Sequence, residues 1–257
     1  MKEQLQKDFD NTIRNLSLSQ KDIEIKKFYL DNFINKGFPN RREEDWKFSD
    51  LNQIIKKNIG ELSFYSDYKS TNKVDTSAFV DGLEHNKIVF INGRIEKIDF
   101  DYEKKDQIEI IDQSETINKF NNNSSLSDLN SAFTNKSFKI VVKEGYQLTK
   151  PLIIYHTTNS KIWSKNINLR LNFELYENSS LRLIDLFRDT SEKNFINIFY
   201  NFDLKENSIL KNYKVDKFEN KNIKYSSIIL NKIKIVFQKH SFYLQDQIFV
   251  RMKLIVT

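Results

Sequence analysis

The second half of the chain repeats a short turn that leads into an apolar, β-prone run, and this repeat constrains the fold more than any other feature. The turns have the sequences EGYQL (144–148), ENSSL (177–181) and ENSIL (206–210). Their glutamates are 33 and 29 residues apart, a spacing typical of stacked structural units. No long helical pattern interrupts the β-prone runs, which cover 139–142, 152–155, 169–175, 181–184 and 195–200.

Two architectures suit such a repeat. Parallel strands need a connection longer than a hairpin turn. A β-helix supplies it by coiling the chain so that each strand lies on an earlier one. An antiparallel sandwich also accommodates short strands with turns between them, and the repeat alone does not separate the two.

The first part of the chain is predicted to be helical. The sequence SQKD (19–22) resembles a capping box, in which a hydroxyl and an acid satisfy free N–H groups at a helix start. Ile25, Tyr29 and Phe33 follow at helical spacing. Gly37 suits the position just after a helix, and the proline two residues later prevents the helix from resuming.

Further elements follow before the repeat begins. A second helix is predicted from Ser49, and residues 61–73 are expected to be a linker. The sequence KIVFINGR (87–94) predicts a strand that ends in an Asn-Gly turn. Residues 115–127 are rich in asparagine and serine and predict a loop, and 128–133 predict a short helix.

Composition excludes several classes of site. The chain has no cysteine, so it cannot form a disulfide or ligate a cluster through its own thiolates. Its histidines, His85, His156 and His240, lie far apart and outside any metal-ligand motif. The net charge is +6, but basic and acidic residues are interleaved, so we expect no nucleic-acid partner. We also expect no membrane contact and a cytoplasmic location, because no apolar run reaches the ~18 residues of a membrane span.

The stretch GFPNRREEDWKFSDL (37–51) resembles the N-terminal signature of the SufB/SufD family of iron–sulfur cluster assembly proteins. That signature has the form G-x-P-(T/N)-R-(K/R)-x-E-x-W-K-(Y/F)-(T/S)-D-L. The residues that carry the resemblance are expected to serve structure or partner contact: Gly37, Pro39, Arg41, Glu44, Trp46, Lys47, Asp50 and Leu51.

Further matches follow in the order of the family. They are FINGR (90–94), LNSAF (129–133), VKEG (142–145) with KPL (150–152), and the two later repeats 177–183 and 206–215. The resemblance spans about residues 20 to 230 and is greatest to the SufD branch, which the short, cysteine-free body also favours.

The resemblance implies a mainly β fold with an N-terminal α-helical region, in which an incomplete right-handed parallel β-helix forms the body. The expected divisions are a helical region (1–60), a mixed α/β connecting region (61–135), β-helix rungs (136–230) and an aberrant tail (231–257). Each rung is one coil of the β-helix.

The function implied by the resemblance is that of a non-catalytic scaffold subunit in the SUF system. Such a subunit pairs with a SufB-like paralogue and a SufC-like ATPase, and an iron–sulfur cluster is assembled on the intact complex. We expect no catalytic, cofactor-binding or metal-ligating residue in this chain alone.

The tail (233–257) lacks the rung pattern, and we interpret it as the product of a frameshift. Restoring one A to an A-run near Lys232 allows the same bases to encode a SufD-like continuation. The nucleotides across codons 230–236 test this interpretation. The region that docks the ATPase in the family is then missing, and we expect a poorly soluble product that does not recruit the ATPase.

The signature residues also have plain structural roles. The run RREE (41–44) is expected to be a solvated, charged turn before a helix. We expect Trp46 and Phe48 to pack the helical region onto the β body, and His156, which follows an apolar strand, to be a packed histidine.

Two other functions compete with the scaffold. A β-helix enzyme acting on polysaccharides would need carboxylates or basic groups that recur on one groove face, and no such cluster recurs on the predicted strands. A basic nucleic-acid-binding module would show a salt-dependent interaction with DNA.

Overall fold

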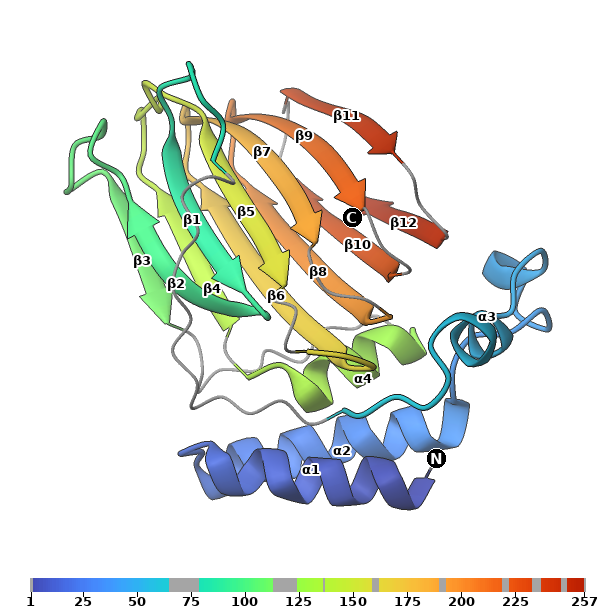
Figure 1. The fold of residues 1–257 in the computed structure, drawn as a ribbon. Helices are drawn as coiled ribbons and strands as arrows, with labels where there is room; N and C mark the ends of the chain where they lie inside the picture. Colours follow the sequence, from blue (N-terminus) through green and yellow to red (C-terminus); the bar gives the residue numbers. More distant parts are fainter. Residues whose placement is uncertain are drawn as a thin grey trace.

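The computed structural model describes residues 2–64, 79–112, 124–135, 137–158, 162–189, 193–218, 222–232, 237–245 and 249–256. The protein is mainly β, with a helical region at the N-terminus and two six-stranded mixed sheets that face each other (Figure 1). The predicted linker 61–73 and loop 115–127 lie partly outside the described residues.

The predicted helix after residue 19 is confirmed. Helix α2 runs from Gln20 to Lys36, and the Ser19 hydroxyl accepts a hydrogen bond from the Asp22 N–H at 3.2 Å. At its C-terminus Gly37 has φ of 73° and donates its N–H to the Phe33 carbonyl at 2.7 Å. Because that φ suits glycine best, the helix ends where the sequence predicts.

The other helices differ in detail from the sequence prediction. Helix α1 (Lys2–Asn15) was not predicted as a separate helix, although Leu5 and Phe9 form a buried i, i+4 pair on it. Helix α3 (Leu51–Asn58) begins after an Asp50 cap rather than at Ser49. The remaining helical segments are the 3₁₀ turn η1 (Glu44–Trp46) and α4 (Ser125–Phe133), which begins three residues before the predicted helix.

Twelve strands form the two sheets. The first sheet has the order β11-β9-β7-β5-β1-β2, and the second has the order β12-β10-β8-β6-β4-β3. The strand bounds are β1 Asn86–Ile91, β2 Arg94–Asp99, β3 Ile108–Asp112, β4 Ser137–Val142, β5 Leu152–Thr158, β6 Asn166–Leu175, β7 Ser180–Asp189, β8 Phe195–Leu204, β9 Ile209–Phe218, β10 Ile223–Lys232, β11 Phe237–Gln245 and β12 Phe249–Val256.

From β4 onward consecutive strands alternate between the two sheets, and each pairs in parallel with the next strand but one. The antiparallel sandwich weighed from the sequence would instead pair neighbouring strands antiparallel. Only β2 and β3, at the start of each sheet, pair antiparallel among the described strands. The turn between β1 and β2 is the predicted Asn92-Gly93 turn, with φ of 53° and 78°.

The repeated turns stack on one another, as their spacing suggests. The Gly145 N–H donates to the Glu177 carbonyl at 2.8 Å, and the Asn178 N–H donates to the Glu206 carbonyl at 3.0 Å. A second stack joins the starts of β8 and β10, where the Asn194 N–H donates to the Asn222 side chain at 2.6 Å. These hydrogen bonds determine which turn stacks on which.

The interior between the sheets and the outer face of the second sheet hold separate apolar clusters. The interior cluster includes Leu171, Leu183 and Tyr200. The outer cluster joins α1, α2 and α4 to β8 and β10 through residues such as Phe133 and Phe195. The buried helix α4 lies between the N-terminal helices and the strands (Figure 1).

The tail continues both sheets at the level of the backbone. β11 pairs in parallel with β9, and β12 pairs in parallel with β10. The sequence of 233–257 lacks the rung pattern, so the presence of two strands there differs from the prediction. The frameshift interpretation concerns the gene and stays a prediction. In the described part of the chain, no helix combines the length and apolar character needed to cross a bilayer.

Candidate functional site

The family-signature segment (37–51) lies where the helical region meets the second sheet. Trp46 is 5% exposed, and its ring stacks 6.0 Å from that of Tyr225 on β10. Phe38 makes an edge contact of 5.8 Å with Phe195 on β8. Phe38 and Trp46 therefore hold the helices against the outer face of the sheet, as predicted for Trp46.

Four further signature residues shape the turn itself. Gly37 ends α2, as described above. The Pro39 carbonyl accepts the Leu51 N–H at 3.1 Å, which closes the segment into a loop. Asp50 caps α3 by accepting the Gln53 N–H at 2.9 Å, and the Leu51 side chain is fully buried. Their roles in this structure are conformational.

The charged signature residues face solvent. Arg41, Glu44 and Lys47 are exposed, and Lys47 pairs with Glu44 at 3.1 Å. The prediction of a solvated, charged turn is confirmed. The prediction that Phe48 packs onto the β body is wrong, because its side chain is 87% exposed. Phe48, two residues after the buried Trp46, points away from the junction, and the Lys47 ammonium lies 5.2 Å from the centroid of the Phe48 ring.

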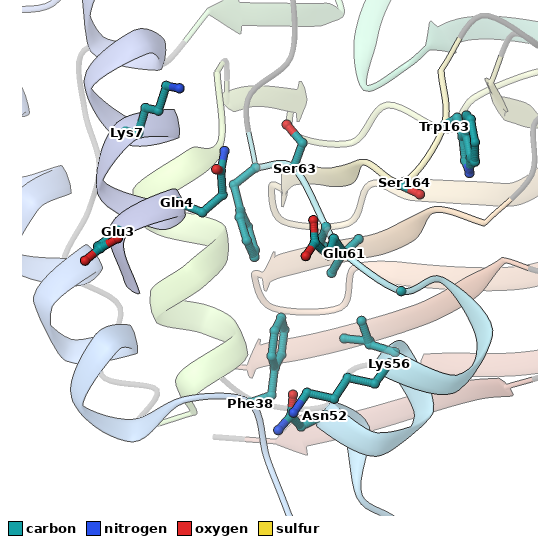
Figure 2. A pocket seen from close by; sticks show the side chains of 14 residues that line it. Glu3, Gln4, Lys7, Phe38, Asn52, Lys56, Glu61, Ser63, Trp163 and Ser164 are labelled. Carbon is teal, nitrogen blue, oxygen red and sulfur yellow. The ribbon is translucent and has the colours of Figure 1, made fainter. Parts of the chain in front are cut away.

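An open groove lies between the helical region and the strands (Figure 2). Its volume is about 970 Å³, near the upper end for small-molecule sites. Phe38, Asn52 and Lys56 lie at one end of it, and Trp163 lies apart at the far side. The fourteen lining residues are Glu3, Gln4, Lys7, Phe38, Asn52, Ile55, Lys56, Gly60, Glu61, Leu62, Ser63, Phe64, Trp163 and Ser164.

The groove is lined by charged, polar and apolar side chains together. Its charges are of both signs, with Lys7 and Lys56 among the cations and Glu3 and Glu61 among the anions. The lining has no histidine, the most frequent base partner of a serine nucleophile. The groove can hold an apolar group, but nothing among its described residues selects a ligand.

A buried ionic cluster crosses the interior from one sheet to the other. Asp185 on β7 lies 2.6 Å from His156 Nε2 on β5 and accepts hydrogen bonds from Lys214 on β9 and from the hydroxyl of Tyr200 on β8. The Lys214 ammonium also lies over the Tyr200 ring at 3.6 Å from its centroid.

A second ion pair lies on the next layer. Lys224 on β10 donates to Asp216 Oδ1 on β9. The same ammonium lies 4.8 Å from the centroid of Phe187, and the Phe187 ring also stacks on the His156 ring at 5.7 Å. The two ion pairs therefore belong to one continuous set of interior side chains.

Opposing effects set the pKa values in this cluster. Burial alone would raise the pKa of Asp185, but Lys214 and His156 outweigh it and hold that pKa well below its usual range. Burial and the nearby Asp185 carboxylate raise the pKa of Tyr200 well above 10. Burial lowers the pKa of Lys214, against the pull of Asp185. The cluster thus favours ionised Asp185 and neutral Tyr200.

These side chains contain the group types of an acid–base site, but they are sealed from solvent. His156 is 3% exposed, Asp185 1% and Tyr200 fully buried. The His156 ring is held between Phe90 and Phe187, with centroid distances of 5.4 and 5.7 Å. A substrate could not reach these atoms without opening the sheets, so the geometry fits the predicted packed histidine.

A second pair of buried cations lies at the C-terminal end of α4. Lys26 Nζ donates to the carbonyls of Ser131, Ala132 and Thr134 at 3.3, 3.4 and 2.7 Å. Arg170 Nη2 donates to the Ser131 hydroxyl at 2.9 Å. Burial, followed by the charge of Arg170, lowers the pKa of Lys26 to about 7. A cation at this end complements the helix dipole and joins α2 to α4.

Sequence reasoning did not find the ionic cluster or Lys26. One signal was present, because Asp185 and Lys214 are 29 residues apart, the same separation as the glutamates of their two turns. Within the described ranges, no group of three or more His, Asp or Glu side chains is placed to hold a metal ion. The expectation that this chain alone binds no cofactor stays a prediction.

Comparisons with known proteins do not assign a family to this arrangement. No protein-family model matches the chain. No curated protein matches it either.

Proposed function

We propose that this chain is a non-catalytic scaffold subunit of the SUF system for iron–sulfur cluster assembly, most similar to the SufD branch. The observation that carries the proposal is the match of residues 37–51 to the SufB/SufD signature. The position of this segment supports the proposal, because a segment that holds two parts of the fold together is expected in a protein that acts as a scaffold.

The proposed architecture of the body is a right-handed parallel β-helix. Support comes from the alternation of consecutive strands between two sheets and from their parallel pairing. The stacked turns at Gly145, Asn178 and Asn207 add to this, since Asn207 Nδ2 donates to Asn178 Oδ1 at 3.3 Å. Stacked asparagines are expected where identical turns recur in a coil.

In this proposal the partner of the chain is a SufB-like paralogue, the intact complex also contains a SufC-like ATPase, and the assembly works in the cytoplasm. The cluster is the cargo of the complex. Because the chain has no cysteine, any thiolate ligand must come from a partner. The exposed charged turn with Arg41 and Glu44 offers a polar contact surface at the edge of the helical region.

Co-expression with partners from the same genome tests the proposal. In the fraction that stays soluble, the tagged chain is expected to co-elute with the SufB-like paralogue, but not with the ATPase, in size-exclusion chromatography. A charge-reversed variant, Arg41→Glu, tests whether the exposed turn takes part in binding the paralogue. Phe48→Ala, in the same segment, is the matched control variant.

Two further assays address the competing functions. The folded chain is expected to release no reducing sugar from acidic glycans and to show no salt-dependent shift of DNA. A chain with a native circular dichroism spectrum that retains no paralogue, or that cleaves a glycan, would overturn the scaffold proposal.

A further inference from the structure

The interior between the sheets changes from apolar to polar along the stack. On β6 the inward side chains include Leu169, Leu171 and Phe173, all in the main apolar cluster. On β9, three strands later, Asn212 belongs to an alternating row of inward polar residues that also includes Lys214 and Asp216. Facing them on β10 are Lys224 and Ser226. These five polar side chains are 0 to 1% exposed.

The charges of this polar layer are already matched. Lys214 donates to Asp185, and Lys224 donates to Asp216. Two carboxylates and two ammonium groups therefore balance within the interior. A bound ion would leave a net charge in a low-dielectric region, which is strongly unfavourable. Any further occupant of the layer should be neutral.

Four polar atoms in the layer have no hydrogen-bond partner among the described residues. They are both amide atoms of Asn212, Oδ2 of Asp216 and Oγ of Ser226. Buried polar atoms in native proteins are almost always satisfied by protein groups or by ordered water. Leaving several unsatisfied in one layer is costly, so a partner for them is expected.

We propose that the β9–β10 layer is a hydrated site that binds ordered water at Asn212, Asp216 and Ser226. The Asn212 Nδ2 group needs an acceptor, whereas Asn212 Oδ1 and Asp216 Oδ2 need donors. Water is the smallest neutral molecule that both donates and accepts, and buried water typically makes about three such bonds. Asn212 and Asp216 are four residues apart on one strand, roughly 13 Å, so the site takes more than one molecule.

The apolar end of the same layer stays dry. Leu210 on β9 and Ile228 and Leu230 on β10 belong to the main apolar cluster and are at most 1% exposed. The hydrated part is therefore confined to the 212–216 and 224–226 segments. This boundary makes the proposal specific to named side chains rather than to the interior as a whole.

The first test measures the effect of removing the unpartnered atoms. Asn212→Leu and Ser226→Ala replace polar groups with apolar ones in separate variants. If water is bound, each variant loses bonds and its urea midpoint falls, with an unfolding constant raised about fivefold per bond lost. If the layer is dry, each variant removes an unsatisfied group and its midpoint rises. Asn201→Leu is the control for losing a known hydrogen bond, because Asn201 Oδ1 accepts from Asn231 Nδ2 at 3.1 Å. Its midpoint should fall whether or not the layer holds water.

The second test does not depend on variants that fold. In the ¹⁵N-labelled wild-type chain, the Asn212 side-chain amide is expected to show nuclear Overhauser contacts with long-lived water. The Leu210 methyl groups, at the dry end, are expected to show none. Absence of water contacts at Asn212, or a raised midpoint in both variants, would overturn the proposal.

Discussion

Replacing Trp46 with alanine tests whether the signature segment holds the helices on the β body. Trp46 is 5% exposed and stacks on Tyr225 at 6.0 Å with the ring planes 29° apart. Truncating a buried tryptophan costs about 3–5 kcal/mol in unfolding free energy. The aromatic pair accounts for about 0.5–1.5 kcal/mol of this beyond area burial. We therefore expect Trp46→Ala to lower the unfolding free energy by about 3 kcal/mol or more.

Urea unfolding followed by far-UV circular dichroism measures the effect. The matched control is Phe48→Ala, two residues away in the same segment, where the side chain is 87% exposed. A change within about 0.5 kcal/mol is expected there. A double-mutant cycle with Tyr225→Ala isolates the stacking contribution, and the coupling should fall in the range given above.

One result would refute the reasoning. If Trp46→Ala and Phe48→Ala have equal small effects while paralogue binding is lost only with Trp46→Ala, the tryptophan serves a partner rather than the fold. Fluorescence helps to separate these outcomes, because Trp163, the second tryptophan, is 67% exposed and reports little on the junction.

Three other changes follow from the described contacts. Asp50→Ala removes the cap of α3 and should cost about 1 kcal/mol in chemical denaturation. Asp185→Asn leaves Lys214 buried without its carboxylate and should lower the unfolding free energy by about 3–5 kcal/mol. The double variant Asp185→Leu/Lys214→Met should lower it much less. Equal losses in the two variants would contradict the assignment of a buried ion pair. Burial lowers the pKa of Lys26 from 10.5 to about 7, so the folded state binds fewer protons than the unfolded state between these values. Stability should therefore rise with pH across that interval by up to about 1.4 kcal/mol per unit, and Lys26→Met should flatten the slope in thermal scans at several pH values.

Local elements of this fold could be predicted from the sequence because their signals are local. The cap at Ser19, the glycine at position 37 and the Asn92-Gly93 turn each specify a backbone conformation through their own side chains or lack of one. The glutamate turns 33 and 29 residues apart identified the stacking unit. Helix α1 lies within the predicted helical region 1–60 but was not predicted as a separate helix, because charged residues surround the i, i+4 pair of Leu5 and Phe9.

The interior could not be predicted to the same degree, because strand register decides which polar side chains meet. Asp185 lies beside Lys214 only because β7 and β9 pair with those residues as partners. A shift of either strand by one residue would turn that strand's side chain to the outer face and separate the pair. For the same reason, the sequence could identify the signature around Trp46 but not its partner Tyr225, which lies far along the chain on β10.

The antiparallel strands β2 and β3 give the stack two unlike ends. Both sheets begin with a strand that runs against its neighbour, and β2 carries four charged residues: Arg94, Glu96, Lys97 and Asp99. The charges on β2 disfavour pairing with the edge of another sheet, because charged side chains on an edge strand discourage the addition of a further strand. This end of the first sheet is therefore protected against aggregation by the residues of its own edge strand.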